Sequence, residues 1–502
     1  MDLRDLICGL PIDVVRSVRG LRVSDLTEDS RTVLPGSLFV ARPGLSSDGR
    51  RYIEQAIARG AAAVLTDATT ARDIAGPVGA VLTAGDLRET TALLAERFFG
   101  NPSKRLRLAG VTGTNGKTTV AHLAHGLLNA AGQRCGLIGT VTIDDGREAA
   151  PAEMTTLPSI ELSRTLATMV DHGCTCAVME VSSHALDQGR VSALSFDAGV
   201  FTTLGIDHLD YHGTIESYAA AKAKLFEMLP RSAAAIVNAD DPACDRMLSA
   251  CRARRLRCSA SSGDATLDIT SRTLSSCDVS LTGPFGALAA SLPLAGDYNA
   301  MNLLLAVCVA HAFGASGSGL RAGIARPALP RGRLERVSRD ADDVTVLIDF
   351  AHTPDALESV LQAVRGVAGG SLCVVFGCGG DRDTTKRPTM GGIASSRADR
   401  VVLTSDNPRS EDPSGIVREI LAGVPAGDRG PVQVVVDRSA AIATAIADAD
   451  PGDVVIIAGK GHEQTQVSAD GVMAFDDREH AARALRRRAE VSSAFQEQTG
   501  RA

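Results

Sequence analysis

A glycine-rich turn lies between a strand-like and a helix-like pattern. It occupies residues 110–120, Gly-Val-Thr-Gly-Thr-Asn-Gly-Lys-Thr-Thr-Val. Residues 106–111 form an apolar run typical of a buried strand, and apolar residues recur at helical spacing over 117–131. Such a turn directs backbone N–H groups and the positive end of the helix at an anion. The stretch therefore predicts a phosphate-binding loop within an α/β fold.

Two side chains of this loop have predicted roles in nucleotide binding. Lys117 would supply a positive charge to the outer phosphates, and Thr118 a hydroxyl to Mg²⁺. The loop departs from the usual P-loop, since Val111 stands at the position of the first glycine and Gly110 lies one residue earlier. The order of strand, loop and helix still favours a phosphate site over a turn that needs glycine for geometry alone.

The composition indicates a large enzyme with several domains. A length of 502 residues exceeds what one core supports, and a net charge of −7 argues against nucleic acid as a partner. No apolar stretch approaches the roughly 18 residues of a membrane span, and the N-terminus lacks a signal-peptide core. The 11 cysteines include no Cys-x-x-Cys pair, which favours reduced core thiols. We expect a cytoplasmic monomer that binds neither nucleic acid nor membrane.

Alternating strand and helix patterns divide the chain into three predicted domains. Residues 1–104 form an N-terminal domain that ends in a polar, proline-bearing linker at 100–105. Residues 105–328 carry a βαβ series that predicts a central, mainly parallel sheet, with a small β insertion at 267–293. Residues 329–502 alternate again and predict a second doubly wound, Rossmann-like domain.

Polar side chains follow two strand-like runs of the central domain, where open α/β sheets bind ligands. Glu180 lies near the end of the run 176–182, and its carboxylate suits Mg²⁺ beside substrate phosphates. Asp207-His-Leu-Asp-Tyr-His follows the next run. Two histidines and two aspartates in so short a stretch favour a functional site over separate structural roles.

Ordered motifs continue through nearly the whole chain. They lie at 29–31, 113–119, 155–156, 179–184, 207–213, 218–222, 238–241, 296–302, 332–335, 349–354, 377–382, 406–409 and 459–463. In residue types, order and spacing they resemble the Mur ligase family, and Asp406-Asn-Pro-Arg resembles the type within it that adds diaminopimelate. The resemblance implies an ATP-dependent ligase that joins diaminopimelate to UDP-MurNAc-L-Ala-D-Glu through an acyl phosphate, in peptidoglycan synthesis.

Four residues match the catalytic positions of that family: Lys117, Glu180, His208 and Lys222. Pattern alone predicts that Lys222, with Lys224, lies on a solvated helix face over 218–226. The resemblance implies instead that CO₂ carbamylates Lys222, which turns a cation into an anion able to support Mg²⁺. The implied metal ligands are Thr118, Glu180, His208 and the carbamate on Lys222.

The resemblance also implies three sets of substrate contacts. The ATP set is Gly113, Thr114, Asn115, Gly116, Lys117, Thr118, Thr119, Asn299, Arg333 and Asp349. The UDP-substrate set is Ser30, Leu45, Ser46, Ser47, Thr155, Thr156, Ser182, Gln188 and Arg190. The diamino-acid set is Arg382, Asp406, Asn407, Pro408, Arg409, Gly459 and Glu463. A guanidinium binds a carboxylate through two parallel hydrogen bonds, so Arg409 favours diaminopimelate, which has a distal carboxylate, over lysine, which has none.

Some positions depart from the family pattern, namely Glu28, Met154, Gly205, Ile206 and Phe350. None of them removes a phosphate or metal ligand, but they leave open a related ligase that joins another carboxylate and amine. A folylpolyglutamate-synthetase-like ligase is a further alternative, against which Asp29-Ser-Arg and Asp406-Asn-Pro-Arg argue. A binding protein without activity would have lost at least one of the four catalytic residues, and the chain retains them all.

Overall fold

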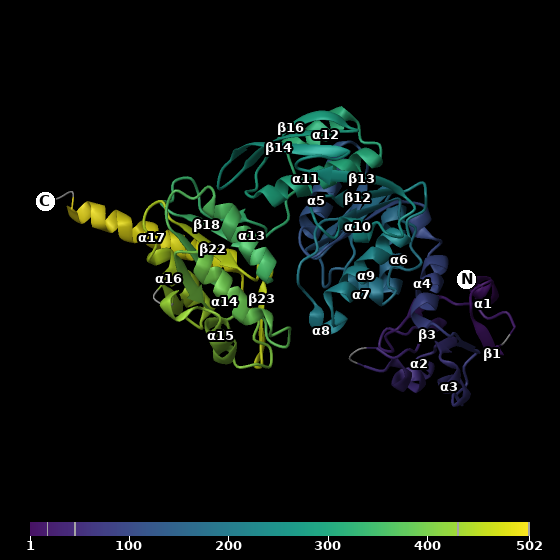
Figure 1. Cartoon of the computed structure of the whole chain (residues 1–502). Helices are drawn as coiled ribbons and strands as arrows, with labels where there is room; N and C mark the ends of the chain where they lie inside the picture. The colour runs from purple at the N-terminus through teal and green to yellow at the C-terminus, as the bar shows by residue number, and fades with distance from the viewer. Residues whose placement is uncertain (18, 45–46, 429–430, 500–502) are drawn as a thin grey trace.

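The structure, a computed structural model, describes residues 1–17, 19–44, 47–428 and 431–499. Along the chain come a 5-stranded sheet, an 11-stranded sheet, a 6-stranded sheet and a 2-stranded hairpin. Figure 1 shows the first three as successive bodies, with the largest sheet in the middle one. The predicted α/β architecture with three domains is confirmed. The boundaries at residues 104 and 328 stay predictions.

The N-terminal sheet has the strand order β1-β5-β4-β3-β2. Its strands are β1 (Asp13–Ser17), β2 (Asp25–Thr27), β3 (Ser37–Val40), β4 (Ala63–Thr66) and β5 (Ala80–Thr83). Its helices are α1 (Leu3–Ile7), η1 (Gly49–Tyr52), α2 (Ile53–Ala58), α3 (Ala68–Arg72) and α4 (Leu87–Phe98), and η2 (Pro102–Lys104) leads out of it. Strands β3, β4 and β5 are short apolar runs that are buried throughout, whereas the edge strand β1 is exposed at every residue.

The central sheet has the order β16-β15-β14-β13-β12-β11-β6-β10-β7-β8-β9. Its strands are β6 (Arg107–Thr112), β7 (Cys135–Ile138), β8 (Thr142–Asp144), β9 (Ala149–Pro151), β10 (Cys176–Glu180), β11 (Ala198–Phe201), β12 (Ala234–Asn238), β13 (Arg254–Ser259), β14 (Ala265–Arg272), β15 (Cys277–Gly283) and β16 (Gly286–Leu292). Its helices are α5 (Lys117–Ala130), α6 (Ser159–Asp171), α7 (Ser183–Asp187), α8 (Leu209–His212), α9 (Ile215–Glu227), α10 (Cys244–Met247), α11 (Asp297–Ala312) and α12 (Gly317–Ala325). Strands β7, β10, β6, β11, β12 and β13 run parallel, as the βαβ pattern predicts.

The predicted β insertion at 267–293 is part of this same sheet. Strand β14 pairs parallel with β13, and β15 and β16 follow as antiparallel neighbours. Alternate residues of β15 and β16, among them Leu281 and Leu288, are buried in the core that surrounds α11. The alternating pattern therefore marks a sheet edge with one covered face, not a separate unit.

The C-terminal sheet has the order β17-β18-β22-β19-β20-β21. Its strands are β17 (Glu335–Arg336), β18 (Thr345–Asp349), β19 (Leu372–Phe376), β20 (Arg400–Leu403), β21 (Val432–Val434) and β22 (Val454–Ala458), followed by the hairpin of β23 (Thr465–Ser468) and β24 (Gly471–Ala474). Its helices are α13 (Pro354–Arg365), α14 (Lys386–Arg397), α15 (Pro413–Ala422), η3 (Ala426–Asp428), α16 (Arg438–Ala447) and α17 (Asp477–Thr499). Within the six-stranded sheet, all strands but β17 are parallel, which is the doubly wound arrangement expected.

The parallel register of the central sheet brings three predicted motifs together. Strand β6 lies between β10 and β11, so the carboxyl ends of the three strands are neighbours. The phosphate loop follows β6, the segment that begins at Val181 follows β10, and the loop that leads to His208 follows β11. Among the helices of the described ranges, none combines the length and the apolar character that a membrane crossing needs.

Candidate functional site

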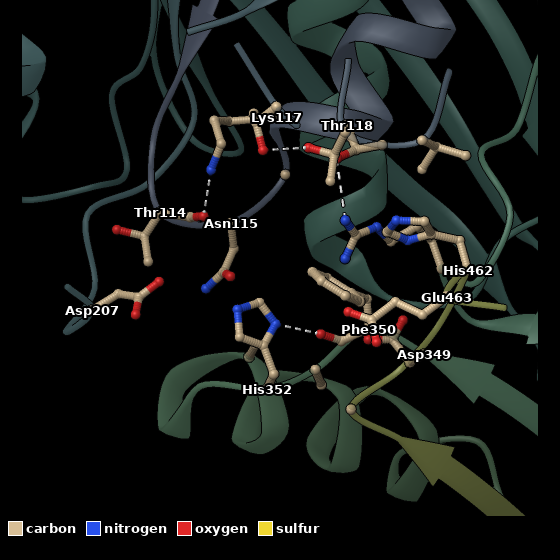
Figure 2. Close-up of a pocket in the computed structure, with 18 of the residues that line it drawn as sticks. Thr114, Asn115, Lys117, Thr118, Asp207, Asp349, Phe350, His352, His462 and Glu463 are labelled. Carbon is tan, nitrogen blue, oxygen red and sulfur yellow. Dashed lines mark hydrogen bonds between the residues drawn. The ribbon is translucent and has the colours of Figure 1, made fainter. Parts of the chain in front are cut away.

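A cavity of about 1510 Å³ lies between the central and C-terminal domains. Figure 2 shows Lys117 and Thr118 on its central-domain wall, facing Phe350, His352 and His462 on the other wall. The predicted site residues that line it are Thr114, Asn115, Gly116, Lys117, Thr118, Thr119, Thr155, Glu180, His208, Asn299, Arg333, Asp349, Arg382, Asp406, Asn407, Arg409, Gly459 and Glu463. One space thus joins the predicted ATP and diamino-acid sets.

The phosphate loop has a backbone that favours glycine at two positions. Gly113 has a φ of 148°, and a Cβ there would lie 1.9 Å from Oγ1 of Thr202; Gly116 has a φ of 85°. Nζ of Lys117 donates hydrogen bonds of 2.9 Å to the carbonyl oxygens of Gly113 and Thr114. Burial lowers the pKa of Lys117. The loop presents this ammonium and the N-terminus of a 14-residue helix to the cavity, as phosphate binding requires.

Glu180 is fully buried at the end of β10, and both of its carboxylate oxygens accept hydrogen bonds. Oε2 accepts from the hydroxyls of Thr118 and Thr140, each at 3.0 Å, and Oε1 accepts from the backbone N–H of Thr140 at 2.7 Å. Thr118 in turn accepts a 3.1 Å hydrogen bond from Arg333 of the C-terminal domain. A carboxylate and a hydroxyl therefore stand side by side at the phosphate loop, and these are oxygen ligands that Mg²⁺ prefers.

His208 lies just before α8 and has a left-handed backbone with a φ of 54°. Its Nε2 is 3.4 Å from Oδ2 of Asp207, and its ring meets that of His184 edge-on at 4.7 Å between centroids. Burial lowers the pKa of His208 to about 4, so the ring is neutral at physiological pH. A neutral imidazole keeps a lone pair for a metal ion or a metal-bound water.

Lys222 is buried, so the solvated position that the helical pattern predicts for it is wrong. The residue is 1% exposed; its Nζ donates a 2.7 Å hydrogen bond to the carbonyl oxygen of Gly113 and lies 4.3 Å from the ring centroid of Tyr218. Burial, together with the nearby Lys117, holds the pKa of Lys222 well below its usual value. The deprotonated amine is the form that reacts with CO₂. Lys224 does occupy an exposed position, where it pairs with Asp187 at 2.9 Å.

In the part of the chain that the structure describes, no three or more histidine, cysteine or acidic side chains are grouped to hold a metal ion. A metal here would depend on substrate phosphates as well as on protein ligands. Thr118, Glu180 and His208, with a carbamate on Lys222, fit Mg²⁺, which binds through one or two carboxylates plus phosphates and waters.

The cavity wall beside Arg333 carries buried polar atoms that have no hydrogen-bond partner in the part of the chain that the structure describes. They are the hydroxyl of Tyr298, Nε of Arg333 and Nδ1 of His462. The Arg333 guanidinium lies 4.5 Å from the ring centroid of Phe350. The ring centroids of Phe350 and His462, both labelled in Figure 2, are 4.9 Å apart. Unpaired polar atoms beside flat rings fit a planar, polar ligand such as a nucleotide base with its ribose.

The predicted adenosine residues Asn299 and Asp349 line the same cavity and are held by their own hydrogen bonds. Asn299 donates to the carbonyl oxygen of Ala295 at 2.8 Å, and Asp349 accepts from the backbone N–H of Leu334 at 2.7 Å. Burial raises the pKa of Asp349. Tyr298, Phe350 and His462 also line this cavity. Their residue types alone predict no role in binding, but each lies within one of the ordered motifs at 296–302, 349–354 and 459–463, which is the signal that could have indicated one.

The predicted diamino-acid residues gather around the ends of β20 and β22. Asn407 donates from Nδ2 to Oε2 of Glu463 at 2.7 Å, and Arg409 donates to the carbonyl oxygen of Gly380 at 2.7 Å. Arg382 bonds only the Asp381 carbonyl oxygen, at 3.0 Å. Among the described residues, neither guanidinium forms an ion pair with a carboxylate. Burial, with Arg382 nearby, lowers the pKa of Arg409, although the carboxylates of Asp406, Glu463 and Asp381 act in the opposite direction.

Two residues of this set act through the backbone. Gly459 has a φ of 110°, and a Cβ there would lie 2.6 Å from Oδ2 of Asp406. Pro408 does not line the cavity, but it precedes Arg409, whose φ of 52° is left-handed. These backbone constraints set the path of the chain beside Asp406 and the direction in which the Arg409 side chain leaves the backbone.

The predicted UDP-substrate residues lie mostly beside the cavity. Thr155 accepts a 3.0 Å hydrogen bond from Thr140, and Thr156 donates to the carbonyl oxygen of Glu180 at 2.9 Å. Arg190 donates to the Thr156 carbonyl oxygen at 2.8 Å. It also donates to the Gln188 side chain, at 3.1 Å from Nε. Ser182 caps α7, where its hydroxyl accepts from the backbone N–H of Ala185 at 3.2 Å.

The rest of that set belongs to the N-terminal domain. Ser30 donates to Gln55 at 2.7 Å, and Ser47 bonds the hydroxyl of Tyr52 at 3.4 Å. Neither lines the cavity. Leu45 and Ser46 lie outside the described residues.

A phosphate loop on a parallel sheet, facing a Rossmann-like domain across one cavity, defines an enzyme that uses a nucleoside triphosphate. Three family models match the chain: "Mur ligase family, catalytic domain" over residues 22–98, "Mur ligase middle domain" over 111–310 and "Mur ligase, glutamate ligase domain" over 332–461. The chain belongs to the Mur ligase family.

Curated relatives are similar along nearly their whole length. UDP-N-acetylmuramoyl-L-alanyl-D-glutamate--2,6-diaminopimelate ligase of Synechococcus elongatus is 43% identical, over 97% of this chain and 99% of that protein. The enzyme of the same name from Geobacillus thermodenitrificans is 42% identical, over 97% of this chain and 100% of that protein. A solved structure of a ligase with this name is 32% identical, with a TM-score of 0.68 over 97% of this chain and 99% of that one.

A more distant likeness concerns the fold alone. Folylpolyglutamate synthase of Mycobacterium tuberculosis is 22% identical with a TM-score of 0.60, and the match covers 78% of this chain and 93% of that one.

Proposed function

We propose that this protein joins diaminopimelate to UDP-MurNAc-L-Ala-D-Glu, with ATP as the energy source, in peptidoglycan synthesis. One observation carries the proposal: a single cavity is lined by Lys117 and Thr118 and also by Arg409, which forms no ion pair with a carboxylate among the described residues. An ATP phosphate and an amino acid with a free carboxylate can therefore occupy the same space. The relatives' shared name, at 43% identity, supports this choice of substrates.

The chemistry explains why ATP is needed. A carboxylate does not react with an amine at neutral pH, because its leaving group would be oxide. Transfer of the γ-phosphoryl group gives an acyl phosphate and ADP. The amine then attacks the acyl carbon, and phosphate leaves from the tetrahedral intermediate. The protein has to align the reactants and offset the negative charge that develops.

The central domain supplies most of the groups that handle this charge, and the C-terminal domain adds Arg333. Lys117 and the loop N–H groups hold the phosphates, and Arg333, already within 3.1 Å of Thr118, adds a second cation. Thr118, Glu180, His208 and a carbamate on Lys222 would hold Mg²⁺, and the bound ion would stabilise negative charge on the phosphoryl oxygens. The carbamate forms when the deprotonated Lys222 amine adds to CO₂ and loses a proton.

The C-terminal domain selects the amine. Arg409, with Arg382 beside it, receives the distal carboxylate, and Glu463, to which Asn407 donates a hydrogen bond, receives an ammonium group. Asn299, Arg333 and Asp349 hold the adenosine, while Thr155, Thr156, Ser182, Gln188 and Arg190 reach the muramoyl peptide, and Ser30 with residues 45–47 the uridine diphosphate.

Two further proposals concern the cellular compartment and the oligomeric state of the protein. The nucleotide and amino-acid substrates are charged and water-soluble, so we propose that the protein works in the cytoplasm. The two walls of the cavity come from one chain, so we propose that a monomer is sufficient for activity.

The test is phosphate release by the purified protein with ATP, Mg²⁺ and UDP-MurNAc-L-Ala-D-Glu, given diaminopimelate, lysine, ornithine or glutamate. Release only with diaminopimelate, with a product of the expected mass, is the result expected. Release with another amine, or with a folate acceptor and glutamate, would support one of the alternative ligases instead.

A further inference from the structure

Lys460 is a buried lysine that none of the roles described so far includes. It follows β22 between Gly459 and Gly461, is 0% exposed, and does not line the cavity. Its Nζ donates to Oδ1 of Asn407 at 2.9 Å and to Oε2 of Glu463 at 3.0 Å. A buried ammonium is costly unless it is paired, so this lysine is held where two cavity-lining side chains meet.

The contacts of Lys460 fix which way Asn407 points. Oδ1 of Asn407 accepts from Lys460 and also, at 3.0 Å, from the backbone N–H of Val467 in β23. An amide rotated by 180° would set its NH₂ group against these two donors. Nδ2 is therefore held toward Glu463, to which it donates at 2.7 Å.

The same contacts leave one carboxylate oxygen of Glu463 available. Oε2 accepts from both Asn407 and Lys460, while no hydrogen bond to Oε1 occurs among the described residues. Glu463 lines the cavity and is 32% exposed at its side chain. Glu463 thus keeps one oxygen, Oε1, available to a ligand in the cavity, while the positive charge of Lys460 offsets the charge of the carboxylate at Oε2.

We propose that Lys460 is a positioning residue that, directly and through Asn407, orients Glu463 toward the ammonium group of the incoming diamino acid. The proposal rests on the proposed function, because it takes Glu463 as the ammonium contact. Lys460 does not touch the substrate; it acts through Glu463. Without Lys460, the Asn407 amide can rotate by 180° and the Glu463 side chain can turn toward the nearby Arg409. The ammonium group of the amino acid then no longer meets a carboxylate in a fixed position.

The experiment compares KM values in the intact enzyme. Lys460→Met keeps the length of the side chain and removes its charge, and it should raise KM for diaminopimelate roughly 10- to 100-fold, the worth of a charged hydrogen bond. KM for ATP and for UDP-MurNAc-L-Ala-D-Glu should stay within about twofold. Lys224→Met, at an exposed lysine that also pairs with a carboxylate, is the matched control and should leave all three KM values unchanged.

A double-mutant cycle separates positioning from a general structural role. In a Glu463→Gln background, Lys460→Met should change KM for diaminopimelate by less than about threefold, because residues that act as one unit are not additive. An equal change in both backgrounds, or an equal rise of all three KM values, would overturn the proposal. Lys460→Gln, which keeps a donor for Asn407, replaces Lys460→Met in the cycle if the latter does not fold.

The proposal and the function on which it rests can fail separately. A wild-type protein that releases no phosphate with diaminopimelate refutes the proposed function. A wild-type protein that does so, while Lys460→Met keeps the wild-type KM for diaminopimelate, refutes only the role of Lys460.

Discussion

The backbone N–H of Ile206 donates a 2.9 Å hydrogen bond to Oδ2 of Asp355, which ties a loop of the central domain to the first turn of α13 in the C-terminal domain. The preceding residue, Gly205, donates from its N–H to Oγ1 of Thr114 in the phosphate loop at 2.9 Å. A Cβ at Gly205 would lie 2.1 Å from Oδ2 of Asp355. The departure from the family pattern at Gly205 thus makes room for a link between the two walls of the cavity.

This link leads to a first prediction. Asp355→Ala removes the acceptor, and KM for ATP should rise about 2- to 10-fold, since a hydrogen bond at a partly exposed site contributes about 0.5–1.5 kcal/mol. Asp355→Asn keeps an oxygen that can accept from Ile206 and serves as the control. Steady-state kinetics at varied ATP measure the effect, and equal KM values for wild type and Asp355→Ala would refute a role for the link.

The second prediction concerns Lys222. If this buried lysine carries CO₂, Lys222→Ala should lower kcat by roughly 10²- to 10³-fold, as loss of a group that supports transition-state charge does. Lys222→Arg should not restore activity, because a guanidinium does not form the carbamate, whereas a short-chain carboxylic acid should partly restore Lys222→Ala. The exposed neighbour variant, Lys224→Ala, should behave as wild type. Full activity of Lys222→Ala would exclude the carbamate.

The third prediction concerns the phosphate loop. Lys117→Ala removes a cation that binds the transferring phosphoryl group more strongly in the transition state, so kcat should fall by roughly 10²- to 10³-fold. The fold should persist, because within the described residues Nζ of Lys117 donates only to two carbonyl oxygens of its own loop. Turnover rate and thermal unfolding, measured on the same preparation, check both statements. An unchanged kcat would remove this lysine from the mechanism.

The fourth prediction is the choice of amine. Arg409 is partly buried and forms no ion pair with a carboxylate among the described residues. Once the substrate covers it, leaving one member of the charge pair unpaired costs about 2–5 kcal/mol. Diaminopimelate should therefore exceed lysine in kcat/KM by roughly 30-fold to several thousand-fold. Arg409→Ala should shrink this ratio, mainly by its effect on diaminopimelate. Equal use of the two amines by the wild type would show that Arg409 does not bind the distal carboxylate.

The fifth prediction concerns stability and pH. Glu96 on α4 is buried beside the central domain, where it accepts hydrogen bonds from Ser103 at 2.7 Å and Ser163 at 3.2 Å. Burial raises the pKa of Glu96 above its usual 4.5. The folded protein therefore holds this proton more tightly than the unfolded chain does. The resulting stability is fully present below pH 4.5 and is lost as the pH rises through the raised pKa.

Glu96→Gln removes this titration, and its amide can accept from one serine hydroxyl through Oε1 and donate to the other through Nε2. The variant should have a higher Tm than wild type at neutral pH, and the difference should shrink as the solution approaches pH 4.5. Thermal unfolding at several pH values measures it. A difference in Tm that is the same at every pH would contradict the assignment to Glu96.

The sequence by itself determined the regular elements and the order of the motifs. The apolar runs at 234–238, 372–376 and 454–458 coincide with β12, β19 and β22, because a short apolar run between turn residues has few ways to be buried other than as a central parallel strand. The glycines of the phosphate loop also predicted a tight turn. Gly113 and Gly116 do adopt positive φ values, which other residues adopt only with strain.

Only the tertiary structure decided which polar side chains are buried together. The helix that carries Lys222 has the pattern of a solvated face, yet Lys222 reaches Gly113, which lies 109 residues earlier in the chain. Lys460 likewise meets Asn407 across 53 residues. Local patterns report on the faces of one element, whereas the pKa, pairing and orientation of a side chain depend on what other elements place beside it. For this reason the sequence indicated the phosphate loop directly, but only the fold revealed the buried lysines that surround the site.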